Sequence, residues 1–229
     1  MASNNSPIIT SLENEEHWLK NKCHLSEGPY LRPFAPNTKW REASVFIVGL
    51  NPATPFKDEF NSYEHYWNSL TRFPEQYYNI YRGKYKKSEE ERSRTSQRIR
   101  ELLTLLSPLN VLVTNVYAYP TVNPLNIPTW IRKEPINERI LVQLFSICKP
   151  RVLFFHGREA RIFANKYFGV ELNPSTHPYC QRTLVKLPAT NNSCWLFAYH
   201  HLVGRVDSKE VVSLRIKQFA EQILHCANV

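Results

Sequence analysis

Residues 45–52 read Val-Phe-Ile-Val-Gly-Leu-Asn-Pro, and this stretch decides the fold. Its four consecutive apolar residues, Val45 to Val48, indicate a strand that is buried on both faces, as the strands of parallel sheets are. Open α/β sheets bind their ligands beyond the carboxyl ends of such strands. Because Pro52 fixes its own φ and keeps Asn51 extended, the Asn51 amide is held rigidly at that edge. The alternative interpretation is a strand that ends in an ordinary Asn-Pro turn.

A second apolar run ends in polar residues near the other end of the chain. Residues 195–205 read Trp-Leu-Phe-Ala-Tyr-His-His-Leu-Val-Gly-Arg, so the run is followed directly by His200 and His201. Histidine transfers protons or stabilises an anionic leaving group near neutral pH. Two strands that end in asparagine and histidine indicate one composite site at a sheet edge. The alternative is a pair of histidines whose rings hydrogen-bond to backbone groups.

Two further strand candidates lie between these stretches. Residues 111–121 end their apolar run at Thr114-Asn115, and residues 150–160 pass through Gly157 into a helix. Helical patterns cover residues 88–106, which open with a capping box at Ser88–Glu91, and residues 136–147, 160–168 and 208–225. The alternation of strands and helices predicts a three-layer α/β/α fold around a central, mainly parallel sheet of four strands.

Length and composition predict one domain. The chain has 229 residues and no Gly/Ser-rich linker, so we expect a single α/β domain over residues 41–229. Residues 1–40 are polar and proline-rich, and we expect them to form an N-terminal helix and wrapping loops. No run is long enough to span a membrane and no signal peptide is visible, which predicts a cytoplasmic monomer without membrane contact. Such a protein would associate with the nucleoid in a bacterium or enter the nucleus of a eukaryote.

The five cysteines indicate reduced thiols. Their number is odd and no Cys-x-x-Cys spacing occurs, so neither a disulfide framework nor an iron–sulfur cluster is expected. His177 and Cys180 lack the paired spacing of zinc ligands. We therefore expect no metal and no cofactor.

The net charge of +9, from 29 basic and 20 acidic residues, favours a polyanionic partner. Basic residues gather in residues 82–100, with tyrosines just upstream, as suits phosphate contacts and base stacking. In this segment, we expect Lys84, Lys86 and Lys87 to contact DNA. The alternative is a solvated helix face that Glu89 to Glu91 partly neutralise.

Taken in order, these motifs resemble those of the uracil-DNA glycosylase superfamily, from about Val45 to about Phe219. Gly49 to Pro52 is similar to the first motif, nearest its form in the mismatch-specific and single-strand-selective branches. Asn115 stands where the family reads the flipped base, and residues 150–160 are similar to a strand and helix of several branches. Residues 201–205 resemble the second motif, with Leu202-Val203 in place of Pro-Ser.

The resemblance implies a monofunctional DNA glycosylase, which flips a nucleotide out of DNA and hydrolyses its N-glycosidic bond to leave an abasic site. Asn51 would hold the attacking water by its amide oxygen, and His201 would stabilise the leaving base. His200 is the alternative if the motif register shifts by one residue. The expected partner is duplex or single-stranded DNA, and the expected role is base-excision repair or defence against phage with modified DNA.

Base recognition would fall to Asn115, whose amide offers a donor and an acceptor to the base edge. Ala53 replaces the family's glycine, and in the most uracil-specific branch this position is a tyrosine that blocks C5-substituted bases. The resemblance thus implies a substrate that is uracil or, favoured by Ala53, a C5-substituted pyrimidine. The candidates for stacking on the base are Phe56, Phe60 and Tyr66.

The loop that wedges into the duplex in the family corresponds to Leu202, Val203, Gly204 and Arg205. Two other classes of protein remain open. One is a catalytically silent nucleic-acid-binding module of the same fold, which the loss of Pro-Ser would fit. The other is a different α/β hydrolase or a nucleotide-binding enzyme, although no phosphate-binding Gly-rich loop and no Gly-x-Ser-x-Gly elbow occurs in the sequence.

Overall fold

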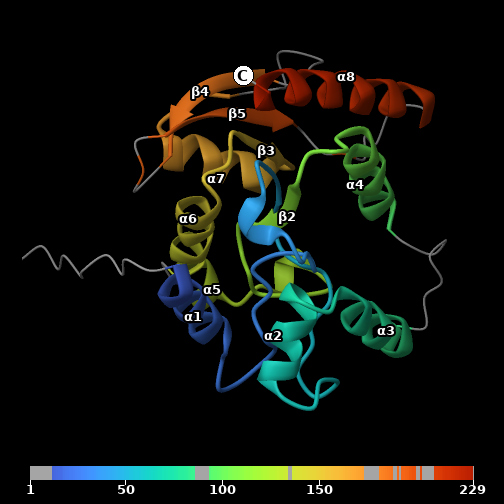
Figure 1. Ribbon diagram of the computed structural model, residues 1–229, viewed down its shortest axis with the longest axis vertical. Coiled ribbons are helices and arrows are strands. Elements are labelled where there is room, and N and C mark those ends of the chain that lie inside the picture. Colours follow the sequence, from blue (N-terminus) through green and yellow to red (C-terminus); the bar gives the residue numbers. More distant parts are fainter. Residues whose placement is uncertain are drawn as a thin grey trace, which may run out of the picture.

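The structure is a computed structural model, and it describes residues 12–85, 93–133, 136–172, 181–187, 190, 192–199, 202 and 209–228. Its centre is a five-stranded sheet in the order β2-β1-β3-β5-β4 (Figure 1). The strands are β1 (Val45–Gly49), β2 (Val111–Asn115), β3 (Val152–His156), β4 (Gln181–Lys186) and β5 (Ser193–Tyr199). The first three strands and β5 run parallel, whereas β4 is antiparallel to β5. The predicted α/β fold with a mainly parallel sheet is therefore confirmed.

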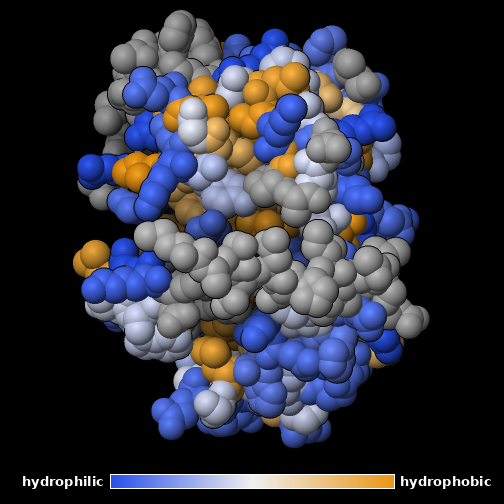
Figure 2. Space-filling view, turned by 90° about the vertical axis from the view of Figure 1, so that its left-hand side faces the viewer, coloured by the Kyte–Doolittle hydropathy of each residue, from blue (hydrophilic) through white to orange (hydrophobic). Residues whose placement is uncertain are grey.

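The predicted number of four strands is wrong, because β4 adds a fifth at the sheet's edge. Its sequence, Gln-Arg-Thr-Leu-Val-Lys, has no apolar run, since an edge strand with one covered face needs few buried side chains. Val185 is buried, but the neighbouring Leu184 is 55% exposed. The side of the molecule shown in Figure 2 carries hydrophobic surface in its upper part, the region of β4 and α7 in Figure 1.

Eight α-helices occur in the described part of the chain. They are α1 (Leu12–Cys23), α2 (Tyr63–Thr71), α3 (Pro74–Tyr85), α4 (Arg94–Leu105), α5 (Thr129–Lys133), α6 (Ile136–Cys148), α7 (Arg158–Phe168) and α8 (Lys209–Ala227). The described residues also form two 3-10 turns, Trp40–Glu42 and Pro124–Asn126. None of the helices in the described part is long and apolar enough to cross a membrane.

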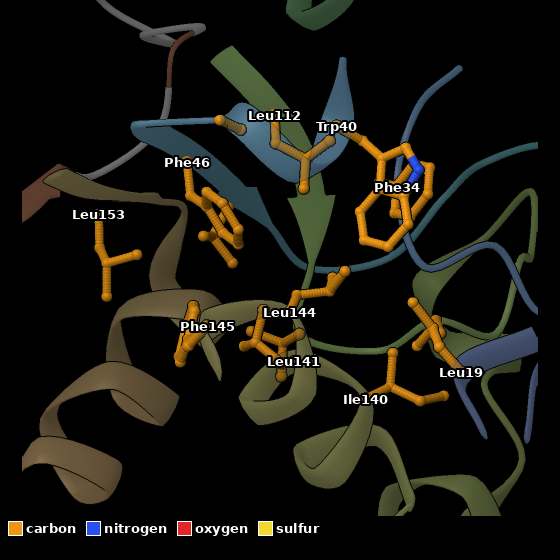
Figure 3. Close-up of a cluster of buried hydrophobic side chains, with 14 of the residues drawn as sticks. Leu19, Phe34, Trp40, Phe46, Leu112, Ile140, Leu141, Leu144, Phe145 and Leu153 are labelled. Atoms are coloured by element: carbon orange, nitrogen blue, oxygen red, sulfur yellow. The ribbon is translucent and has the colours of Figure 1, made fainter. Parts of the chain in front are cut away.

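The apolar strands bury both of their faces, as the sequence predicts. On one face, which we call the α6 face, alternate strand residues such as Phe46 and Leu153 pack against Leu141 and Phe145 of α6 (Figure 3). Leu19 of α1 joins the same cluster. Helices therefore cover this side of the sheet as the expected outer layer.

On the opposite face, which we call the α8 face, the other set of alternate strand residues is covered. Val45, Ile47 and Phe154 pack with Leu102 of α4 and Phe219 of α8. The two helices lie against each other on this side (Figure 1). The expected three layers, helix, sheet and helix, are thus present.

Helix α4 begins later than its sequence pattern suggests. Its N-cap is Ser93, whose hydroxyl accepts a hydrogen bond from the Ser96 amide at 3.2 Å. The capping-box pattern at Ser88–Glu91 lies outside the described residues.

Residues 24–40 run along the outer edge of β2. The Ala35 amide donates to the Val113 carbonyl at 2.8 Å, and Phe34 forms an isolated antiparallel bridge with Thr114. An uncovered edge strand would expose unpaired backbone groups, and this segment satisfies them. Helix α1 precedes this segment in the chain.

Candidate functional site

The carboxyl ends of the parallel strands bring polar residues into one row. Gly49 of β1 lies opposite Asn115 of β2, and His156 of β3 lies opposite Tyr199 of β5. The pairing of Val48 with Phe155 places His156 one step on, beside Gly49. Since side chains alternate along a strand, Asn115, His156 and Tyr199 all point to the α8 face.

Gly49 lets two of these side chains converge. A Cβ atom added to Gly49 would lie 2.9 Å from Asn115 Oδ1 and 3.3 Å from His156 Nε2. Both atoms therefore occupy the space that any other residue would need at the end of β1. The glycine of the Gly-x-Asn-Pro sequence is required by this close approach, and the amide and the imidazole face one small volume above it.

The turn after Gly49 is fastened to the chain that follows β2. The amides of Val116, Tyr117 and Thr121 donate to the carbonyls of Gly49, Leu50 and Pro52, each at 2.9 Å. These three bonds extend the parallel ladder beyond the strands. The turn is thus a rigid continuation of the sheet edge.

Asn51 is oriented by its own amide nitrogen. Asn51 Nδ2 donates to the carbonyls of Pro52 and Thr121, both at 3.1 Å, and to Thr121 Oγ1 at 3.2 Å. Carbonyl oxygens only accept, so these partners fix which end of the amide is nitrogen. Asn51 Oδ1 has no hydrogen-bond partner among the described residues, and it remains available as an acceptor for a ligand or water.

His156 is a site residue that the sequence reasoning missed. It is only 6% exposed and it shares the space above Gly49 with Asn115. The sequence does contain a signal, because His156 ends an apolar strand immediately before Gly157, as Asn115 ends another. The sequence pattern of residues 150–160 predicts only a strand that leads into a helix.

Several predicted site residues lie outside the described part of the structure. These are His200, His201, Val203, Gly204, Arg205, Lys86 and Lys87. Tyr199, the last residue of β5, ends in the same row as His156, and the two histidines follow it directly in the chain.

Leu202 has no exposed surface and belongs to the apolar cluster of the α8 face. A side chain packed among Val212, Ile216 and Phe219 does not reach into a DNA duplex. The predicted wedge role of Leu202 is therefore wrong for this structure. Burying an aliphatic side chain in the core is more favourable in free energy than leaving it in solvent. The motif alone does not tell which of the two occurs.

The predicted stacking residues form the centre of an aromatic cluster. Phe56, Phe60 and Tyr66 are 2%, 4% and 1% exposed, and the rings of Phe56 and Phe60 also contact Tyr77. Burial raises the pKa of Tyr66 well above its usual value. Each ring packs edge-on or tilted against another, with centroids 5.1–5.6 Å apart along the chain Phe56–Phe60–Tyr66. They serve as core residues here, so the stacking assignment is withdrawn.

Lys84 makes internal contacts. It forms an ion pair with Glu59 and donates to the Pro55 carbonyl at 2.8 Å. Although burial acts to raise the pKa of Glu59, the hydrogen bonds from Lys84 and from the backbone outweigh it and lower that pKa. Lys84 therefore anchors the loop after Asn51 to α3, which is a structural task that the charge count did not reveal.

An exposed apolar surface follows Thr121 directly. Val122 is 74% exposed and Leu125 is 83% exposed, and Trp130 of α5 is 51% exposed. The next residues include the exposed cations Arg132 and Lys133. We call residues 122–133, which include the second 3-10 turn and α5, the flanking loop, because they follow Thr121, which holds Asn51 in place.

Within the described part of the chain, no group of three or more histidine, cysteine or acidic side chains is placed to hold a metal ion. A scan against protein-family models and a search of curated proteins found no match to this chain. The resemblance of its motifs to a glycosylase family thus remains a prediction from sequence.

Proposed function

We propose that the protein is a monofunctional DNA glycosylase. The observation that carries the proposal is the meeting of Asn115 and His156 above Gly49, with Asn51 fixed two residues further on. An amide and an imidazole at the carboxyl edge of a parallel sheet suit the recognition of a heterocyclic base, because each offers donors and acceptors in a fixed plane.

Asn51 supports the proposed hydrolysis through its orientation. Both amide hydrogens are used inside the protein, so the oxygen is the part that a water molecule meets. An amide is no base at neutral pH, and the reaction would rely on stabilising the leaving base and the sugar cation. His201 keeps its predicted role at the leaving group, and His156 is added as a contact to the base beside Asn115.

The proposed substrate is uracil or a C5-substituted pyrimidine. Ala53 is exposed, so the position after the motif proline is not filled by packing. The small side chain leaves room for a base that carries a group at C5. We favour a substituted base on this ground.

The flanking loop replaces Leu202 as the proposed contact to DNA. Exposed Val122 and Leu125 stand next to the segment that anchors Asn51, and apolar side chains of this kind insert between base steps. Arg132 and Lys133 would add phosphate contacts. A glycosylase must hold DNA open beside its pocket, and the flanking loop would do so.

The test is incubation with DNAs that carry uracil, mismatched thymine, 5-hydroxymethylcytosine or its glucosylated form, followed by alkali cleavage at abasic sites. We expect cleavage with at least one C5-substituted base. Asn51→Ala should slow all accepted bases alike, because it acts on water and sugar, whereas Asn115→Ala should change their ranking. Binding of DNA without abasic sites from any base would identify the protein as a silent binding module.

A further inference from the structure

Arg32 lies where three separate segments of the chain meet beside the Asn51 turn. Its backbone amide donates to the Ala118 carbonyl at 2.8 Å, in the segment that leads to Thr121. Its Nη1 donates to Thr54 Oγ1 at 2.7 Å and to the hydroxyl of Tyr77. The guanidinium carbon lies 5.8 Å from the centre of the Tyr77 ring. The side chain is half-buried and firmly positioned.

Among the described residues, this cation has no anionic partner. None of the ion pairs among the described residues includes Arg32. Burial acts to lower the pKa of Arg32, but the phenols of Tyr77 and Tyr66 outweigh it and raise that pKa. The guanidinium therefore stays charged at any working pH, and its neighbours are phenols instead of carboxylates.

The nitrogens that remain unused form one edge of the guanidinium. Thr54 and Tyr77 both occupy Nη1, which leaves Nε and Nη2 without protein partners in the described part of the chain. Neither nitrogen is among the fully buried side-chain atoms that lack a partner, so each keeps some contact with solvent. These two N–H groups point in parallel from one side of the planar group, which matches two oxygens of a phosphate.

Keeping such a cation out of full contact with water costs free energy unless something compensates. The hydroxyls of Thr54 and Tyr77 satisfy one nitrogen but carry no charge. An arginine that is fixed on three sides and has no counter-ion among the described residues is arranged for an anion supplied by a ligand.

We propose that Arg32 binds a phosphate group of a nucleotide held beside the Asn51 turn. Thr54 and Tyr77 act as positioning residues, which hold the guanidinium with its open edge towards the ligand. The assignment goes beyond the proposed glycosylase activity, because the phosphate can belong to a DNA chain or to a free nucleotide.

The experiment measures binding of four probes by titration calorimetry: inorganic phosphate, a deoxypyrimidine 5′-monophosphate, its unphosphorylated nucleoside and a short single-stranded oligonucleotide. The variants are Arg32→Met, which keeps the length without the charge, and Arg32→Lys, which keeps the charge without the fork. Arg72→Met is the matched control, because Arg72 is an exposed arginine at the end of α2 that takes no part in the hydrogen bonds to Thr54 and Tyr77. Circular dichroism checks that each variant is folded, and if Arg32→Met does not fold, Arg32→Lys carries the test.

Arg32→Met should weaken binding of a phosphorylated probe about 10- to 100-fold, as loss of a charge-assisted bidentate contact does. Arg32→Lys should show a smaller loss, and nucleoside binding should not change. A loss with the oligonucleotide alone assigns the phosphate to a DNA chain, and a loss with the monophosphate as well assigns it to any nucleotide. A loss no greater than that of Arg72→Met with every phosphorylated probe would overturn the proposal. Absence of base excision with this binding intact would remove only the glycosylase function.

Discussion

Gly49 and Asn51 belong to one turn, yet they contribute in opposite ways. Gly49 contributes by the absence of a side chain, which leaves the space where Asn115 Oδ1 and His156 Nε2 meet. Asn51 contributes through its side chain. Its Nδ2 donates hydrogen bonds to Thr121, and its Oδ1 has no hydrogen-bond partner among the described residues. The proposed site depends on both features.

Gly49→Ala should therefore slow excision about 100-fold without unfolding the protein. The new methyl group would approach Asn115 Oδ1 to 2.9 Å, so the amide or the strand must shift. Misplacing a reacting group by about 1 Å lowers the rate of an enzymatic reaction about 100-fold. Gly83→Ala is the control, because nothing lies within 4 Å of its Cβ position in α3 and helix propensity favours alanine by up to about 1 kcal/mol. Equal single-turnover rates in the two variants would contradict the assigned site.

Asn51→Asp should lose activity, although a carboxylate is the stronger base. Its oxygens would face the carbonyls of Pro52 and Thr121, which now accept hydrogen bonds from Nδ2. Loss of these bonds and the repulsion should cost about 1–3 kcal/mol of stability and displace the turn. Thr121→Val removes only the bond to Oγ1 and should have a smaller effect. Denaturant unfolding and excision assays measure both, and a faster Asn51→Asp enzyme would refute this account of the amide.

Single residues differ in how well their sequence context reveals them. The positions of Asn51 and Asn115 at one sheet edge were predictable because each ends or follows an apolar strand, and parallel strands end at a common edge. The fates of Phe56 and Leu202 were not, because an apolar side chain after a motif looks the same whether it lines a pocket or joins the core. Only the tertiary packing decides between these outcomes.

At the level of elements, the four parallel strands were predictable and the edge strand was not. The parallel strands need apolar side chains on both faces, and they leave runs such as Val45 to Val48 in the sequence. β4 needs only a partner, β5, and its sequence stays polar. The aromatic segment before residue 86 forms α2 and α3 because its tyrosines pack inward, a pattern that the basic residues concealed.

The flanking loop gives a prediction for an element that sequence patterns did not select. Leu125→Ser should weaken DNA binding or base flipping several-fold, because the exposed side chain loses its apolar contact with bases. Stability should not change, since 83% of the side chain is already in solvent. Fluorescence anisotropy with a labelled duplex measures the affinity, and Leu214→Ser, at a leucine of α8 that is 58% exposed, is the control. Equal affinities for the two variants would remove the flanking loop from the DNA surface.

For the whole molecule, the sheet edge and the charge point to the same class of partner. The net charge of +9 favours a polyanion, and DNA binding by such a protein should weaken steeply as salt rises. Yet Lys84 and Arg98 form ion pairs with Glu59 and Glu101 within the protein. The proposal of a polyanionic partner therefore rests on the total charge, because these two cations are paired within the protein.

The measurement that tests the central claim most directly is the identity of the product released from DNA. Duplex and single-stranded substrates with one uracil or C5-substituted pyrimidine are incubated with the protein, and free base and abasic DNA are quantified by mass spectrometry. A monofunctional glycosylase at this sheet edge should release equal amounts of free base and abasic DNA, with the strand unbroken until alkali is added. Release of a nucleoside or nucleotide, or no product from any base, would contradict the account.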